Sequence, residues 1–81
     1  MISVINTIKQ VCIGCQITVL YPDGSKCTFM IVSERDAVAP EEGKISPYSP
    51  LGSALMGKIE GDTIIYSIKT GITSAKILTI I

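Results

Sequence analysis

Apolar and polar residues alternate over much of this chain, with the period of two that is typical of half-buried strands. The clearest case is the series Ile17, Val19 and Tyr21, which is interrupted by single intervening residues. The same alternation returns in residues 63–68, and β-branched apolar residues dominate residues 74–81. Because such residues favour a pleated, half-buried surface, all three segments are predicted to be strands.

A short turn separates the first of these strands from another predicted over residues 26–32. Residues 22–25 read Pro-Asp-Gly-Ser, which is typical of a tight turn, so the two strands should form a hairpin. The second strand ends in the unbroken apolar run of residues 29–32, which predicts a central strand covered on both faces. Residues 33–43 follow as an exposed acidic loop, and residues 44–46 could form a short strand.

The pattern predicts only one convincing helix, over about residues 50–56. Ser49 is a good N-cap, and Pro50 follows at the first helical position, where its missing N–H costs nothing. Gly57 is suited to the position just after the helix end. A helix of two turns is too short to be stable alone, so it must pack on a sheet. The residues expected to do so are Leu51, Leu55 and Met56.

Several strands with one helix indicate the α+β class: an antiparallel sheet wrapped around one short helix at about residues 50–56. The 81 residues are expected to form a single domain. The weak patterning of residues 1–8 suggests a leader or a linker stub.

The composition limits the kinds of partner that the chain is expected to bind. Seven Lys and Arg balance seven Asp and Glu, so the chain lacks the positive field that drives direct nucleic acid binding. Neither a membrane span nor a signal peptide is visible, which predicts a cytoplasmic protein with reduced cysteines and no membrane partner. Apolar residues make up 47% of this small chain. We therefore expect some apolar surface to be covered by a partner, by a missing part of the chain or by self-association.

Candidate chemistry is sparse. Cys12 and Cys15 have the CxxC spacing of half a zinc site or a redox pair, but only Cys27 could add a third ligand, because histidine is absent. The CxxC also precedes a strand, whereas a thioredoxin-like motif opens a helix. Ordinary packing of the cysteines is the favoured interpretation. Neither a metal nor another cofactor is predicted.

Catalysis is equally hard to support. Without histidine, a general base would have to be a carboxylate or lysine, and the carboxylates lie in polar, turn-like segments. Catalytic residues are therefore not predicted. The free N–H groups of the helix beginning at Ser49 could bind an anion, although capping by Ser49 itself is the more common arrangement.

Residues 43–62 carry the most specific signal. They read Gly-Lys-Ile-Ser, then Ser-Pro-Leu-Gly at the helix start, Ala-Leu-Met-Gly at its end and a Gly-Asp turn. This ordered block resembles the signature of the C-terminal domain of the GreA/GreB transcript-cleavage factors. Residues 32–37 are similar to that family's acidic loop, and residues 17–20 and 77–80 fall where its flanking strands belong. The resemblance implies an FKBP-like fold.

The resemblance also implies a function. In that family this domain does no chemistry but grips the rim of the secondary channel of RNA polymerase, positioning a coiled coil whose acidic tip stimulates transcript cleavage. The family's contacts lie on the loop that leads into the helix, which matches Tyr48, Ser49 and Pro50, with Leu51 beside them. A heptad-patterned coiled coil is not present in the 81 residues, so cleavage stimulation is not expected of them.

The chain departs from the family pattern at two places. Tyr48 replaces an acidic residue or asparagine, and the acidic loop is longer by about one residue around Val38 and Ala39. A stand-alone regulator, similar to the regulators of nucleoside diphosphate kinase that share this domain, is the main alternative. An FKBP-like prolyl isomerase is less favoured, because the chain has few aromatic residues for such a pocket and a fold does not carry activity by itself.

Overall fold

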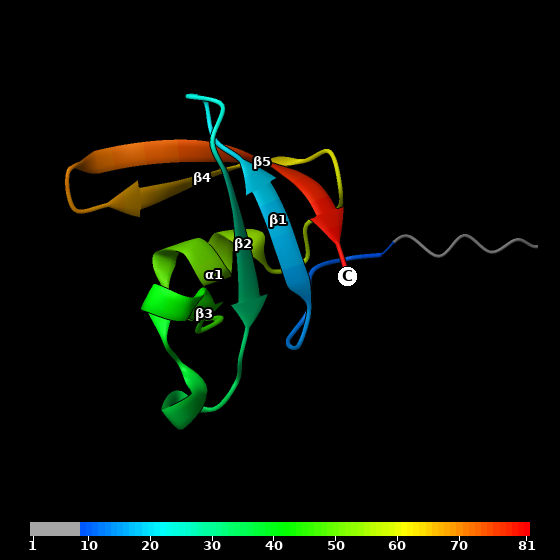
Figure 1. The fold of residues 1–81 in the computed structure, drawn as a ribbon, viewed down its shortest axis with the longest axis vertical. Coiled ribbons are helices and arrows are strands. Elements are labelled where there is room, and N and C mark those ends of the chain that lie inside the picture. Colours follow the sequence, from blue (N-terminus) through cyan, green and yellow to red (C-terminus); the bar gives the residue numbers. More distant parts are fainter. Residues whose placement is uncertain (1–8) are drawn as a thin grey trace, which may run out of the picture.

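The computed structural model describes residues 9–81; the leader or linker stub expected at residues 1–8 lies outside the described residues. One sheet holds five strands in the order β3-β2-β1-β5-β4. The elements are β1 (Gln16–Leu20), β2 (Lys26–Ile31), β3 (Lys44–Ile45), α1 (Pro50–Leu55), β4 (Thr63–Ile68) and β5 (Gly71–Ile80). Figure 1 shows the sheet curling around α1, which confirms the predicted α+β architecture.

Most neighbouring strands pair antiparallel, and one pair does not. β1 lies between β2 and β5, and β5 also pairs with β4, each time antiparallel. The two-residue β3 pairs parallel with the end of β2, so the sheet is mixed. Ile31 of β2 lies opposite Ile45 of β3, which places the chain leaving β3 beside the helix.

The hairpin predicted at residues 22–25 is present and is stabilised by its own polar groups. The backbone N–H of Tyr21 donates to the carbonyl of Ser25 over 2.8 Å. The Asp23 carboxylate accepts from the N–H and the hydroxyl of Ser25, at 2.9 and 2.7 Å. These donors favour the ionised carboxylate and lower the pKa of Asp23.

Two predictions about the strands are wrong. β2 is not covered on both faces: its first three residues are exposed, Phe29 and Met30 are half-buried, and only Ile31 is buried. The single helix packs on the concave face of the sheet only, so the outer face of β2 stays open. In addition, β3 pairs with no more than the last two residues of β2, which leaves the rest of that edge unpaired. β5 begins at Gly71 instead of residue 74, because its first residues pair with the end of β4 in a tight hairpin.

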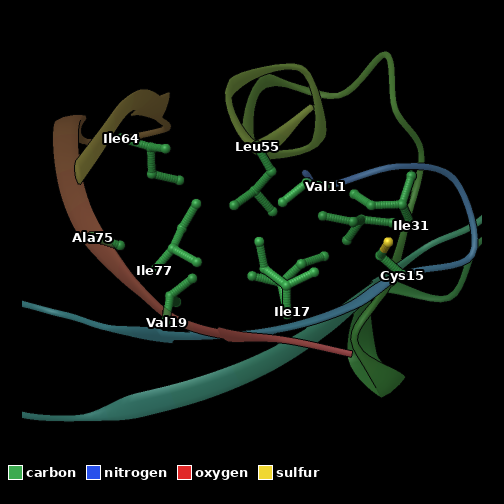
Figure 2. Packing of buried hydrophobic residues seen from close by; sticks show 11 residues of the cluster. Val11, Cys15, Ile17, Val19, Ile31, Leu55, Ile64, Ala75 and Ile77 are labelled. Atoms are coloured by element: carbon green, nitrogen blue, oxygen red, sulfur yellow. The ribbon is translucent and has the colours of Figure 1, made fainter. Parts of the chain in front are cut away.

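The core lies between α1 and the concave face of the sheet. Figure 2 shows Leu55 extending from the helix toward Ile17, with Ile64 and Ile77 contributed by β4 and β5. Leu55, Ile17 and Ile77 are fully buried, as the alternation and the helix pattern predicted. Leu51 and Met56 pack against the same core and stay partly exposed. The other buried apolar residues are Val11, Cys15, Val19, Ile31, Ile45, Ala75 and Ile80.

A tyrosine pair joins the end of β1 to β4. The hydroxyls of Tyr21 and Tyr66 are hydrogen bonded at 2.7 Å, and both side chains are half-buried against the core. Burial, followed by the hydrogen bond to Tyr66, raises the pKa of Tyr21 well above its usual range. The folded state therefore favours the neutral phenol of Tyr21.

This pair gives the domain an alkaline stability limit. The stability that the neutral Tyr21 contributes is fully present below the unfolded pKa of about 10 and is lost as pH rises toward the folded pKa. We expect Tyr21→Phe to lower the free energy of unfolding by about 1 kcal/mol at neutral pH, because the hydrogen bond is lost. Above pH ~10, the stability of this variant should decline less steeply than that of the wild type. Urea unfolding at neutral pH and above pH ~10 measures these free energies of unfolding. Tyr48→Phe, at an exposed position, is the control, and parallel declines in the wild type and Tyr21→Phe would contradict the account.

Candidate functional site

The predicted binding residues lie where β3 leads into α1, in a segment that we call the capping loop, residues 46–49. The Ser49 hydroxyl donates to the carbonyl of Ser46 over 2.8 Å and accepts from the N–H of Gly52 over 3.0 Å. The Ser49 N–H donates to the same carbonyl at 3.2 Å, and the Tyr48 N–H donates to the Ser46 hydroxyl at 3.0 Å. The predicted N-cap is confirmed, and the loop is fixed by its own hydrogen bonds.

Gly52 completes this arrangement, and sequence reasoning missed its role. It is buried in the first turn of α1, directly beneath the carbonyl of Ser46. A Cβ at this position would overlap the Ser46 carbonyl oxygen and lie 2.9 Å from the Ser49 hydroxyl oxygen. Only glycine lets the loop come this close to the helix. The sole sequence signal was the Ser-Pro-Leu-Gly series, in which the glycine is a poor helix former within a two-turn helix.

The structure separates the four predicted binding residues into two groups. Tyr48 is 91% exposed, and Pro50 is also exposed. Ser49 and Leu51 are half-buried, Ser49 in the cap and Leu51 against the core. A large aromatic side chain that is almost fully exposed on a fixed loop is the kind of residue that anchors protein interfaces.

An apolar hollow of about 250 Å³ lies beside the capping loop. Its apolar lining comes from three parts of the chain and includes Val38, Pro40, Ile45, Pro50, Leu51 and Tyr66. A second, larger hollow places Tyr48 near Arg35 and Val38. Tyr48 therefore lies close to hollows that side chains of a partner could fill. We call Tyr48, Pro50, Leu51, Val38 and Arg35 the docking surface.

Residues 33–43 form more than an exposed acidic loop. The chain makes two short 3₁₀ turns, Arg35–Ala37 and Pro40–Glu42, and the carboxylates of Glu34, Glu41 and Glu42 are exposed as expected. Val38, between the turns, is half-buried and lines both hollows. Val38, one of the two residues at which this loop is expected to depart from the family pattern, thus helps to shape the docking surface.

The cysteines do not gather into a metal site. Cys15 is buried in the core, as expected for packing, but Cys12 is exposed and that part of the packing interpretation is wrong. Cys27 is also exposed, on β2. Within residues 9–81, no group of three or more His, Cys, Asp or Glu residues could hold a metal ion.

The surroundings of α1 are poorly suited to two other functions, prolyl isomerisation and anion binding. Tyr66 is the only aromatic residue in its lining, which is less than the aromatic-lined pocket expected of a prolyl isomerase. The N-terminal N–H of Gly52 is already used by Ser49, so the helix start is capped by its own serine and not left open to an anion. What the surface offers is apolar area with one protruding aromatic residue, an arrangement suited to binding.

Together these features define a class of protein: a small α+β domain in which a curled, mixed sheet holds one capped, two-turn helix. The family model described as "Transcription elongation factor, GreA/GreB, C-term" matches residues 6–81. The chain therefore belongs to the GreA/GreB family, in which it corresponds to the C-terminal domain.

Individual relatives agree. The chain is 38% identical over 76 residues to the transcription elongation factor GreA of Thermoanaerobacter pseudethanolicus, covering 90% of this chain and 46% of that protein. It is 35% identical over 69 residues to an uncharacterized protein of Mycobacterium tuberculosis, covering 83% and 43%. The chain thus spans about half the length of the curated relatives it matches, or slightly less.

Solved structures show the same fold. Gfh1 of Thermus aquaticus superposes with a TM-score of 0.80 at 28% identity, over 91% of this chain and 49% of that one. GreA factor homolog 1 of Thermus thermophilus gives 0.77 at 26% identity, over 93% and 50%. The family likeness thus includes the curled sheet and the single helix. Among residues 9–81, no helix is long and apolar enough to cross a membrane.

Proposed function

We propose that this domain docks onto bacterial RNA polymerase through the docking surface, at the rim of the secondary channel. The observation that carries the proposal is Tyr48, a side chain 91% exposed on a loop fixed by four hydrogen bonds. Family membership supports the kind of partner, since relatives that share this domain are named transcription elongation factors. Such a factor would act in the bacterial cytoplasm, where polymerase works.

The capping loop needs to change little on binding. Ser49 and Gly52 hold the backbone on either side of Pro50, so the capping loop is ordered before the partner arrives. A preorganised loop avoids much of the entropy cost that binding otherwise carries. The aromatic ring of Tyr48 has few torsions to freeze and a large area to bury, which are the properties of an interface anchor.

We further propose that these residues bind polymerase without stimulating transcript cleavage themselves. Support comes from the arrangement of the acidic groups: within the described part of the chain, none form a cluster able to hold a metal ion. The exposed residues Glu41 and Glu42 belong to the second 3₁₀ turn, which contacts β3, and do not lie at the end of an extended arm. Docking and cleavage stimulation are thus separate properties in this proposal.

The decisive variant is Tyr48→Ala. We expect its affinity for bacterial core polymerase to fall roughly 30-fold, as for a hot spot of about 2 kcal/mol, because the main aromatic anchor is removed. Its thermal midpoint should not change, because Tyr48 packs against almost nothing. Titration of fluorescently labelled domain with core polymerase measures the affinity.

Ile72→Ala is the matched control, since Ile72 is also apolar and 75% exposed but lies in the β4–β5 hairpin, outside the docking surface. It should bind as the wild type does. Equal losses in both variants would rule out the assigned surface. Absence of binding by the wild type would rule out the proposal itself. Displacement of the bound domain by full-length GreA identifies the secondary channel, and undiminished binding in its presence would place the domain elsewhere.

A further inference from the structure

Cys12 and Cys15 lie at the two ends of a tight turn that leads into β1. The backbone N–H of Cys15 donates to the carbonyl of Cys12 over 3.0 Å, closing the turn. The two Sγ atoms are hydrogen bonded to one another at 2.8 Å, and the Cys12 N–H donates to the Cys15 sulfur at 3.3 Å. A turn closed in this way holds its end Cα atoms within about 7 Å, which overlaps the usual separation of disulfide-bonded residues.

The two thiols differ in access. Cys12 is exposed, whereas Cys15 is 9% exposed and belongs to the core. Figure 2 shows the Cys15 sulfur in the core near Ile31, whose N–H donates to the Cys15 carbonyl. One thiol can therefore meet a small molecule from solvent, and the other can be reached only through the first.

A metal is a poor occupant for this pair. Two sulfurs leave a zinc ion two ligands short, and no third His, Cys, Asp or Glu joins them within residues 9–81. The hydrogen bond to Cys15, followed by burial, raises the pKa of Cys12, so its thiol stays protonated at neutral pH. The thiolate is the reactive form in metal binding and in disulfide exchange alike, so the raised pKa of Cys12 slows both reactions, and it is the missing ligands that count against a metal.

We propose that Cys12 and Cys15 form a redox modification site, which small-molecule disulfides such as oxidised glutathione convert to a reversible internal disulfide. Cys12 attacks first because it is the accessible thiol. Its sulfur bonds to one sulfur of oxidised glutathione, the glutathione S–S bond breaks, and one glutathione thiol leaves with the proton of Cys12. Cys15 then attacks the Cys12 sulfur and releases the second glutathione thiol with its own proton. The protein loses two electrons, and the oxidant gains them.

The disulfide would fasten the beginning of the domain to its sheet. Just before the turn, Val11 is tied to the chain after α1 by hydrogen bonds with Lys58 and Gly57. Within the turn, the Gly14 N–H donates to the carbonyl of Ile31 on β2. Because these contacts already hold both cysteines in place, oxidation should leave the fold unchanged and raise its thermal midpoint.

The experiment treats the full chain with oxidised glutathione, quenches with acid, alkylates the remaining thiols and maps them by peptide mass spectrometry. We expect an internal link between Cys12 and Cys15, which dithiothreitol reverses. Cys27 is a built-in control: it is exposed but has no partner sulfur in the described structure, so it should carry at most a glutathione adduct. The Cys27→Ser variant should form the internal link as the wild type does.

Two variants separate the steps. Cys15→Ala should accumulate a stable glutathione adduct on Cys12, and in folded Cys12→Ser the Cys15 thiol should remain free of any glutathione adduct. The proposal is overturned if wild-type Cys12 keeps its glutathione adduct without resolving it, or if both thiols remain free once Cys27 has reacted. Stoichiometric zinc in the purified protein would overturn it equally. Should Cys15→Ala fail to fold, Cys12→Ser and the wild type still decide the question, and neither result depends on polymerase binding.

Discussion

Gly52→Ala is expected to destabilise the domain by roughly 3 kcal/mol or more, a large share of the total stability of a domain of this size. The added Cβ would overlap the Ser46 carbonyl oxygen. That carbonyl cannot move away freely, because it accepts both the N–H and the hydroxyl of Ser49. In an exposed helix the same change would stabilise by about 1 kcal/mol, but here the steric overlap is larger than this propensity gain.

Ser53→Ala is the matched control for this prediction. It introduces the same residue at the next position of the same helix, where the side chain is exposed and makes one 3.2 Å hydrogen bond to the Pro50 carbonyl. Its stability should stay within about 0.5 kcal/mol of the wild type. Urea unfolding followed by circular dichroism gives both values. If Gly52→Ala kept the stability of the wild type, the capping loop would be able to move aside. The rigidity assigned to the docking surface would then be wrong.

The positions of the strands and the helix could be predicted from local patterns because each pattern reports local physics. Alternation of Ile17 and Val19 places both on the buried face whatever partner strand lies beside them. The Ser49 cap and the Pro50 start satisfy the helix terminus within four residues of chain. Such signals do not depend on the rest of the fold, so the predictions made from them are confirmed.

The partners of each strand could not be predicted in the same way. The apolar end of β2 resembles a central strand, yet only the two residues of β3 pair with it on that side. The direction of β3 follows from the path of residues 33–43, whose 3₁₀ turns return the chain parallel to β2. Loop paths of this kind depend on tertiary contacts, which a period-two pattern does not contain.

The candidate site likewise combines residues that the sequence predicts with surroundings that only the structure shows. Tyr48, Ser49, Pro50 and Leu51 were predicted as binding residues from the family resemblance, and the structure adds what surrounds them. Val38 reaches the docking surface only because two 3₁₀ turns fold it back, and in the sequence it was merely an extra residue in a loop. The exposure of Cys12 beside the buried Cys15 depends on the direction in which one turn enters the sheet, which the CxxC spacing leaves open.

The adjacent residues Ile64 and Ile65 test the packing of β4, at the other side of the core. Ile64 is 2% exposed and packs in the core, whereas Ile65 is 69% exposed on the opposite face of the same strand. Ile64→Ala is expected to cost about 2–5 kcal/mol, from lost burial and the cavity left behind. For a domain of this size, that lowers the thermal midpoint by on the order of 10 °C or more.

Ile65→Ala removes the same atoms from the solvent-facing side, so its effect should remain within about 0.5 kcal/mol. Differential scanning calorimetry of the two variants gives the comparison. It needs no assumption about intrinsic strand preference, because both variants carry the same substitution of isoleucine by alanine. Similar losses would mean that the outer face of β4 is covered in solution, for instance by self-association through Ile65 and Ile72, and a rise of the midpoint with protein concentration would identify that case. A large loss in Ile64→Ala alone would establish that this domain depends on a single buried face, which is why a sheet of five strands needs only one short helix to complete its core.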